Sequence, residues 1–382
     1  MNKILFLLDN PFTNDRRVHR EAKSLVAAGY HIDLIAVKTQ QTAVYEEIDG
    51  IKVHRLLSQD IYDIKKSSCF KKYTKEIIEK FDFDIIHAND QAMLNLGVKI
   101  KKQKRNIKLI YDSHELFRAW PLNTSGNIFI LLKSIIVRKL LQNREARNIK
   151  KIDGLITVNE SIRNDLILHF KLKINSVSIR NIPELTYDVQ GKNILRKEFN
   201  LKADDKILVY IGANIYPKTI NIEQVINEFA NIPNTFMIFI CAFNWGKKAV
   251  EDHASKLGVE NLLFHDLVPP YLINTYLSNA DVGIISSWNK QDLSYWYGLD
   301  NKLFEYMMAE IPILATKQPE YVEIVEKNNI GICINPEIEN FYDAFKKIIA
   351  NRDYYVENIN KVKLFLNWEK ESNKLIEFYK EF

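Results

Sequence analysis

A lysine and a glutamate stand one helical turn apart in the stretch from Asp300 to Pro312. Lys302 lies in the expected first turn of a helix, and Glu305 follows one turn later, before the apolar run at 313–315. A helix N-terminus together with an ammonium group attracts a diphosphate. A carboxylate one turn further on can accept both hydroxyls of a ribose. The spacing suits a nucleotide sugar; the alternative is an ordinary amphipathic helix with an exposed lysine and glutamate.

A histidine among polar residues follows the apolar run at 108–110. His114 stands beside Asp112, Ser113 and Glu115. These neighbours are unusual for a histidine of the core. Because a carboxylate fixes the tautomer of an imidazole, Asp112 or Glu115 could orient the ring. The motif favours a chemical role for His114 over a structural one.

Polar residues also follow two other apolar runs. His87 and Asp90 come directly after the run at 85–86, where they could shape a pocket for a second substrate. After the first apolar run, Arg16 and Arg17 could hold an anionic group. The alternative for that segment is a solvated helix start with Asn14 as N-cap.

Composition limits the classes of protein that fit. The chain has 382 residues, of which 47% are hydrophobic, and this length is sufficient for two domains. No apolar run reaches the roughly 18 residues of a membrane span. The three cysteines are widely separated and do not have the spacing of metal ligands, which predicts a reducing compartment. The net charge of +5 does not require nucleic acid as a partner.

Short apolar runs alternate with helical periodicity along the whole chain, which predicts parallel sheets covered by helices on both faces. Apolar runs predict strands in a first series, and a second series begins at residue 206. A proline follows the extended run at 181–182, so the hinge between two α/β halves is expected near 181–184. Helical periodicity returns at 367–381. In doubly wound sheets, ligands sit at the carboxyl ends of the strands, where the polar residues above are found.

The segment at 301–306 and the Asp-Ser-His-Glu motif at 112–115 resemble retaining glycosyltransferases of the GT-B fold, family 4 (group 1), such as those of bacterial surface-polysaccharide synthesis. The resemblance implies two Rossmann-like, doubly wound parallel-sheet domains facing across a cleft. The acceptor-side domain is expected at 1–182, with a C-terminal helix at 365–382, and the donor-binding domain at 183–364. The implied reaction moves a sugar from a nucleotide-diphosphate donor to an acceptor hydroxyl with retention.

The resemblance also implies roles for single residues. His114 lies at the reacting centre, with Glu115 beside it. Donor-binding positions are Gly212, Lys218, Val268, Asn301, Lys302, Leu303 and Glu305. Positions near the acceptor or the phosphates are Asn14, Arg16, Arg17, His87 and Asp90. The lysines can serve in place of Mg²⁺, so no metal and no other cofactor is expected.

Three positions depart from the family pattern. Glu310 stands where a glycine is usual, Asn89 replaces a second histidine, and Tyr297 replaces the first glutamate of a Glu-x7-Glu motif. The donor sugar is therefore not specified. The aromatic residues at 288–297 either stack on a sugar or base or belong to the core. A nucleotide-sugar epimerase, a phosphorylase and a catalytically silent sugar-binding protein remain alternatives.

A basic helix is predicted around 128–151. This segment combines seven basic residues with many apolar ones, and Glu145 is its only acidic residue. A basic amphipathic helix can lie on an anionic bilayer. The alternative is a helix whose apolar face packs on the core. The membrane interpretation fits family members that modify lipid-linked acceptors, and it predicts a cytoplasmic protein at the inner face of the membrane. A saccharide or a lipid-linked saccharide is the expected acceptor.

Overall fold

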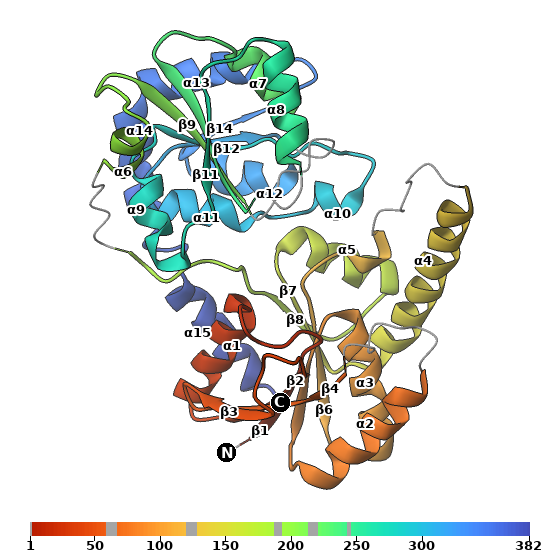
Figure 1. The fold of residues 1–382 in the computed structure, drawn as a ribbon. Coiled ribbons are helices and arrows are strands. Elements are labelled where there is room, and N and C mark those ends of the chain that lie inside the picture. Colours follow the sequence, from red (N-terminus) through yellow and green to blue (C-terminus); the bar gives the residue numbers. More distant parts are fainter. Residues whose placement is uncertain (1, 59–66, 120–127, 187–192, 213–220, 243–245) are drawn as a thin grey trace. The chain divides into compact units, whose positions relative to one another are not determined.

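The computed structural model describes residues 2–58, 67–119, 128–186, 193–212, 221–242 and 246–382 (Figure 1). The chain forms two compact units, Met1–Asn181 with Glu371–Phe382 and Ile182–Lys370. The second unit thus begins one residue before the predicted boundary. The C-terminal segment of the first unit begins at Glu371, whereas the predicted segment began at residue 365.

The first unit contains an eight-stranded sheet in the order β3-β4-β2-β1-β5-β6-β7-β8. Its strands are β1 Lys3–Leu7, β2 His31–Val37, β3 Tyr45–Ile48, β4 Ile51–Leu57, β5 Ile85–Asn89, β6 Lys108–Ser113, β7 Gly154–Thr157 and β8 Asn175–Ser178. Only β3 pairs antiparallel among the described strands. The β3–β4 hairpin and β8 were not predicted, because their polar alternation gives no buried apolar run.

Helices cover both sides of this sheet (Figure 1). They are α1 Arg16–Ala27, α2 Ser67–Lys80, α3 Asp90–Gln103, α4 Ile128–Asn148, α5 Glu160–Phe170 and the last helix, α15 Trp368–Tyr379. The last helix packs into this unit through Leu375, Phe378 and Tyr379, which are all buried. The C-terminus of the chain thereby contributes to the core of the first unit.

The second unit contains a six-stranded parallel sheet in the order β11-β10-β9-β12-β13-β14. Its strands are β9 Lys206–Gly212, β10 Thr235–Cys241, β11 Leu262–Asp266, β12 Val282–Ile285, β13 Ile313–Thr316 and β14 Gly331–Ile334. Counted along the unit, this is the Rossmann order 3-2-1-4-5-6, which reverses between β9 and β12. The strands were predicted to within two residues from their apolar runs.

The helices of the second unit lie on both sides of its sheet (Figure 1). They are α6 Ile194–Glu198, α7 Ile222–Phe229, α8 Lys247–Lys256, α9 Ile273–Leu277, α10 Leu293–Trp296, α11 Asn301–Met308, α12 Pro319–Tyr321, α13 Phe341–Ala350 and α14 Arg352–Val362. Of these, α11 carries Lys302 and Glu305.

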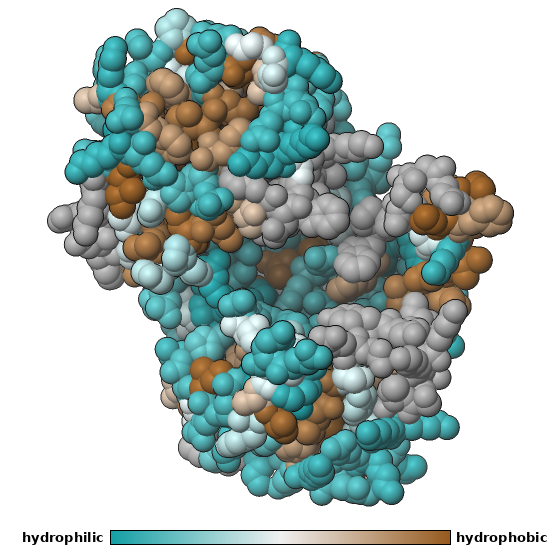
Figure 2. Space-filling view, viewed as in Figure 1, coloured by the Kyte–Doolittle hydropathy of each residue, from teal (hydrophilic) through white to brown (hydrophobic). Residues whose placement is uncertain are grey.

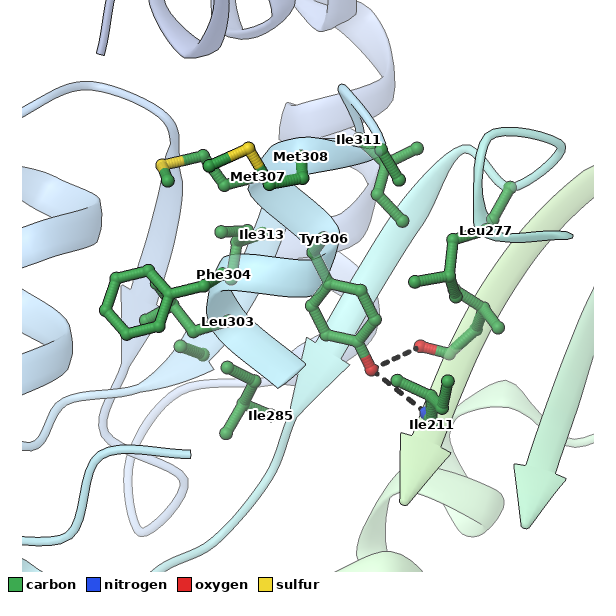
Figure 3. Packing of buried hydrophobic residues seen from close by; sticks show 14 of the residues in the cluster. Ile211, Leu277, Ile285, Leu303, Phe304, Tyr306, Met307, Met308, Ile311 and Ile313 are labelled. Carbon is green, nitrogen blue, oxygen red and sulfur yellow. Dashed lines mark hydrogen bonds between the residues drawn. The ribbon is translucent and has the colours of Figure 1, made fainter. Parts of the chain in front are cut away.

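The position of α11 is fixed by a buried tyrosine. The Tyr306 hydroxyl accepts a hydrogen bond from Ile211 N at 3.1 Å (Figure 3). It can donate to Ile284 O, which lies at 3.1 Å. A Cβ at Gly283 would lie 2.4 Å from the Tyr306 ring, so glycine is required for this close approach. One side chain therefore joins α11 to both strands at the point where the strand order reverses.

Candidate active site

The carboxyl ends of β1, β5 and β6 place the polar residues of the first unit. The strand order reverses between β1 and β5, and ligands of doubly wound sheets bind at such a point. Asp9 follows β1, Asp90 follows β5, and His114 follows β6. Residues more than 100 positions apart in the chain therefore meet at one edge of the sheet.

Two carboxylates hold His114. Its Nε2 lies 2.9 Å from Asp112 Oδ2, and its Nδ1 lies 3.5 Å from Asp90 Oδ2. Its backbone N–H also donates to Asp90 Oδ1 at 3.0 Å. Of the two candidate orienting residues, Asp112 contacts the ring, whereas the side chain of Glu115 is exposed. The ring keeps 19% of its side-chain surface accessible, so it can still meet a ligand.

His114 carries a positive charge at neutral pH. Burial disfavours the imidazolium, but Asp90 and Asp112 outweigh burial and raise the pKa of His114 to about 10. A histidine that is already protonated cannot accept another proton. His114 is therefore suited to stabilising negative charge or to donating a proton, and not to acting as a general base.

The charge of His114 should make stability depend on pH. Its folded-state pKa lies above the unfolded value of about 6.5, so its contribution is complete below about pH 6.5 and is lost as pH rises towards 10. We expect the free energy of unfolding of the parent, minus that of His114→Ala, to be larger at pH 6 than at pH 9. Between pH 6 and pH 9, this difference in unfolding free energy should fall by more than about 1 kcal/mol, since one pKa unit corresponds to about 1.4 kcal/mol. Urea unfolding at both pH values measures it; equal differences would contradict the assigned charge.

The loop after β1 differs from its prediction. Asp15, and not Asn14, caps α1, because its side chain accepts from Val18 N at 3.1 Å. Arg17 is buried, and its guanidinium donates to Ile179 O at 2.7 Å. Arg17 is thus a buried structural cation instead of a surface anion-binding group. Arg16 and Asn14 are exposed.

His87 does not line a pocket. Its side chain is fully buried, and its ring stacks on Phe6 with centroids 4.1 Å apart. His87 lies within β5 and does not follow its end, and its side chain points to the face of the sheet where it contacts Tyr379 of α15. Asp90 has a positive φ of 61° and stays at the edge beside His114.

Three buried side chains of the first unit could reach a metal ion. Glu21, His87 and Asp112 offer ligand atoms within 4.8 Å of one another. However, Arg17 Nη2 lies 2.9 Å from Glu21 Oε1 and 3.1 Å from Asp112 Oδ1. This guanidinium supplies the positive charge that two buried carboxylates require, and it opposes a cation beside it. The group fits a buried ion-pair network, and a metal-independent reaction remains a prediction.

In the second unit, Lys302 stands at the N-terminus of α11. Its Nζ lies 3.1 Å from Asp300 Oδ2 and 4.8 Å from the centre of the Tyr210 ring on β9. Burial disfavours the ammonium, but Asp300 and Tyr210 outweigh burial and raise the pKa of Lys302. A fixed cation thus lies close to the end of β9, where Gly212 closes the strand. Lys218 lies outside the described residues.

The other predicted donor-binding residues differ in exposure. Asn301 is exposed and Glu305 is half-buried, one turn along the same helix from Lys302. The side chains of Leu303 and Val268 are buried in the hydrophobic core of this unit. Figure 3 shows Leu303 there. Any ligand contact of these two residues would have to come from their backbone.

Glu310, where the family has glycine, has a structural explanation. It adopts a positive φ of 58° at the end of α11, the conformation in which glycine is usual. Its carboxylate pairs with the buried ammonium of Lys363, which also donates to Thr186 O at 3.3 Å. The departure thus provides a partner for a buried lysine, and it is not a sign of a lost site.

The aromatic residues around Tyr297 are neither core nor fully exposed. Trp288 and Trp296 contact each other edge to face with ring centroids 5.3 Å apart, and both are half-buried, as is Tyr297. Trp288 Nε1 donates to Glu337 at 3.1 Å, and Lys290 pairs with the same carboxylate at 2.9 Å. Their contact with a sugar stays a prediction.

Family models account for most of the chain. Residues 15–181 match the model of Glycosyltransferase Family 4, and residues 205–351 match that of Glycosyl transferases group 1. The chain belongs to this glycosyltransferase family. It is a glycosyltransferase enzyme, and its two parallel-sheet units are those of the GT-B fold. No curated protein is similar enough in sequence to be matched.

Several solved structures have a similar fold, and the similarity covers nearly the whole length of this glycosyltransferase. Sucrose-phosphate synthase from Thermosynechococcus elongatus has 16% identity and a TM-score of 0.76, covering 100% of this chain and 99% of its own. Anabaena HepE in complex with UDP-glucose has 15% identity and a TM-score of 0.70, covering 100% of both chains. The E. coli trehalose-6-phosphate structure bound with UDP-2-fluoro glucose has 12% identity and a TM-score of 0.71, covering 99% of both. At these identities, the similarity supports the fold alone.

Asp9 is a site candidate of the glycosyltransferase that sequence reasoning did not select. Burial and the neighbouring Asp90 raise the pKa of Asp9 to about 7, against the opposing effect of His114. It stands after β1, at the point where the strand order reverses. In the sequence, Asp9 is recognisable only as an acidic residue that follows the first strand. Its proximity to Asp90 and His114 is created by the tertiary structure.

Proposed function

We propose that this glycosyltransferase moves a hexose from a nucleotide-diphosphate sugar to an acceptor hydroxyl, with retention, in the synthesis of a cell-surface polysaccharide or glycoconjugate. The observation that carries the proposal is the fixed ammonium of Lys302 at the N-terminus of α11, with Glu305 one turn along. This pair suits a diphosphate and a ribose. Two similar structures hold UDP-glucose or its 2-fluoro derivative.

The fixed charge of Lys302 suits a leaving diphosphate. Lys302 is held in place by Asp300 before any ligand binds, so its charge needs no reorganisation during the reaction. When the bond between the anomeric carbon and the diphosphate oxygen breaks, Lys302 offsets the negative charge that develops on the oxygen. The acceptor oxygen forms the new bond to the anomeric carbon, and its proton passes to the departing diphosphate oxygen. His114 is the second charged group that we propose takes part in the transfer, by acting on the donor sugar.

Titration calorimetry with UDP, GDP and ADP tests the donor site directly. We expect one nucleoside diphosphate to bind more tightly than its nucleoside monophosphate, because Lys302 and the helix N-terminus act on the diphosphate. Release of the same diphosphate from the matching nucleotide sugar then tests turnover. Absence of binding by all three would reject the donor site, and binding without turnover would favour the catalytically silent alternative.

The surface of helix α4 supports the proposal that the acceptor is bound to a membrane. Its N-terminal two-thirds expose large apolar side chains, so the core-packing alternative is wrong for this part of the helix. They are Ile128, Phe129, Ile130, Leu132, Ile135, Ile136 and Leu140. Figure 2 shows apolar residues in brown over α4, at the right of the view. Lys133 and Lys139 are exposed on the same helix. Among the described helices, none has both the length and the apolar character needed to cross a bilayer.

We expect α4 to bind anionic membranes weakly and reversibly, at the cytoplasmic face. Its apolar side chains enter the interface, and each basic residue near an anionic surface adds about 1 kcal/mol. Raising the salt concentration should release the protein, because charges are screened within roughly 8 Å at physiological salt. Co-sedimentation with vesicles that contain or lack phosphatidylglycerol measures both effects.

A double variant, Phe129→Ser with Ile136→Ser, should abolish vesicle binding. Leu168→Ser is the matched control, since Leu168 is 76% exposed on α5 of the same unit. Equal binding of the parent to neutral and anionic vesicles, or no binding at low salt, would remove the case for a lipid-linked acceptor.

A further inference from the structure

A tyrosine near the C-terminus contacts a buried histidine of the first unit. The Tyr379 hydroxyl on α15 lies 2.5 Å from His87 Nδ1, although the two residues are 292 positions apart. Both side chains are fully buried, and their rings are within 1° of parallel. Phe6 stacks on the His87 ring at 4.1 Å. This packing fixes the His87 ring in position.

The other nitrogen of His87 faces the carboxylate that holds His114. His87 Nε2 lies 3.5 Å from Asp112 Oδ2 and 3.8 Å from Glu21 Oε2. The same Asp112 oxygen lies 2.9 Å from His114 Nε2. A continuous series of contacts therefore runs from Tyr379 through His87 and Asp112 to His114.

The protons in this series can be assigned. Burial lowers the pKa of His87, so its ring is neutral and carries one proton. Nε2 faces Asp112, whose pKa is held well below its usual value by Arg17 and His114 against the effect of burial, so the proton resides on Nε2 and points towards this carboxylate. Nδ1 is then an acceptor, and the Tyr379 hydroxyl donates to it. Loss of that donor would allow the other tautomer, which presents a lone pair to Asp112.

We propose that Tyr379 is a positioning residue of this glycosyltransferase, which acts through His87 and Asp112 to hold His114. The inference rests on the proposed function, in which His114 acts on the donor sugar. Other charges also face His114: Asp90 at 3.5 Å, with Asp9 and Arg17 interacting at longer range. None of these groups contacts His87 Nδ1, and among the described residues the Tyr379 hydroxyl is the hydrogen-bond partner of that nitrogen.

The network can be tested without a ligand. We would label the full chain with ¹⁵N-histidine and titrate its ring nitrogens by NMR in the parent, in Tyr379→Phe and in Tyr73→Phe. The control removes a buried hydroxyl of the same unit, which contacts Ser58 instead. In the parent, His87 Nδ1 should be unprotonated.

In Tyr379→Phe, we expect the protonation pattern of His87 to change and the titration midpoint of His114 to move by about half a pH unit or more. Tyr73→Phe should leave both unchanged. An unaltered His114 titration in Tyr379→Phe would overturn the proposal, whatever happens at His87.

Kinetics provide a second readout, with release of UDP from UDP-glucose as the probe reaction. Tyr379→Phe should lower turnover about tenfold and leave the affinity for UDP unchanged. In a His114→Ala background, the same substitution should have no further effect, because interacting residues are not additive. An equal loss in both backgrounds would show that Tyr379 does not act through His114. If the parent does not release UDP, then UDP-glucose is not its donor, and the NMR titration alone decides the role of Tyr379.

Discussion

Lys302→Ala is expected to lower turnover roughly 100-fold or more, because removal of one preorganised group that stabilises developing charge typically has this effect. The loss should appear mainly in the rate, since the charge on the leaving diphosphate grows as the bond breaks. Lys302 also contacts Asp300 and Tyr210, so a smaller loss of folding stability is expected. Steady-state release of nucleoside diphosphate, with urea unfolding in parallel, separates the two effects.

Lys290→Ala is the matched control for this experiment. Lys290 is an exposed lysine that follows β12 and pairs with Glu337, and it has no assigned part in the reaction. Its variant should turn over like the parent. If Lys302→Ala retained parental turnover, the leaving diphosphate would have to be held by other groups.

Glu305→Gln should weaken binding of the nucleoside diphosphate about 10- to 100-fold while leaving the fold intact. The substitution keeps the size of a half-buried side chain and removes the charged acceptor proposed for the ribose hydroxyls. Hydrogen bonds to charged groups contribute roughly 1.5–3 kcal/mol, which corresponds to this loss of affinity. Titration calorimetry with the diphosphate that binds the parent is the measurement.

A second glutamate of the same unit serves as its control. Glu323 is exposed and pairs with Lys327 on the surface, so Glu323→Gln should bind like the parent. An unchanged affinity in Glu305→Gln would reject the ribose assignment even if Lys302→Ala behaved as expected. The two substitutions therefore test separate parts of the donor.

The sequence by itself determined the features that depend on short-range pattern. Buried parallel strands are apolar along their length, so the runs at 207–211 and 313–315 predicted strands of the second unit. Lys302 and Glu305 are three positions apart, and any α-helix places such residues on one face. The polar residue types at strand ends likewise marked His114 and its neighbours. The family resemblance rests on these local patterns.

The tertiary structure decided which polar side chains turn inward. Arg17 and His87 have the residue types and spacing of ligand-binding groups, but they are buried against Ile179, Asp112 and Tyr379. These partners lie between 95 and 292 positions away. A buried charge needs a partner that compensates its desolvation, and no local pattern shows where the chain supplies one.

Exposure and compensation also depend on distant residues. The apolar side chains of α4 looked equally suited to the core or to a membrane surface, because periodicity does not show what covers a helix face. In the sequence, Glu310 is only a departure from the glycine of the family, whereas in the structure its carboxylate pairs with Lys363. In each case, the residue type was visible in the sequence, whereas its role depended on a contact that only long-range folding creates.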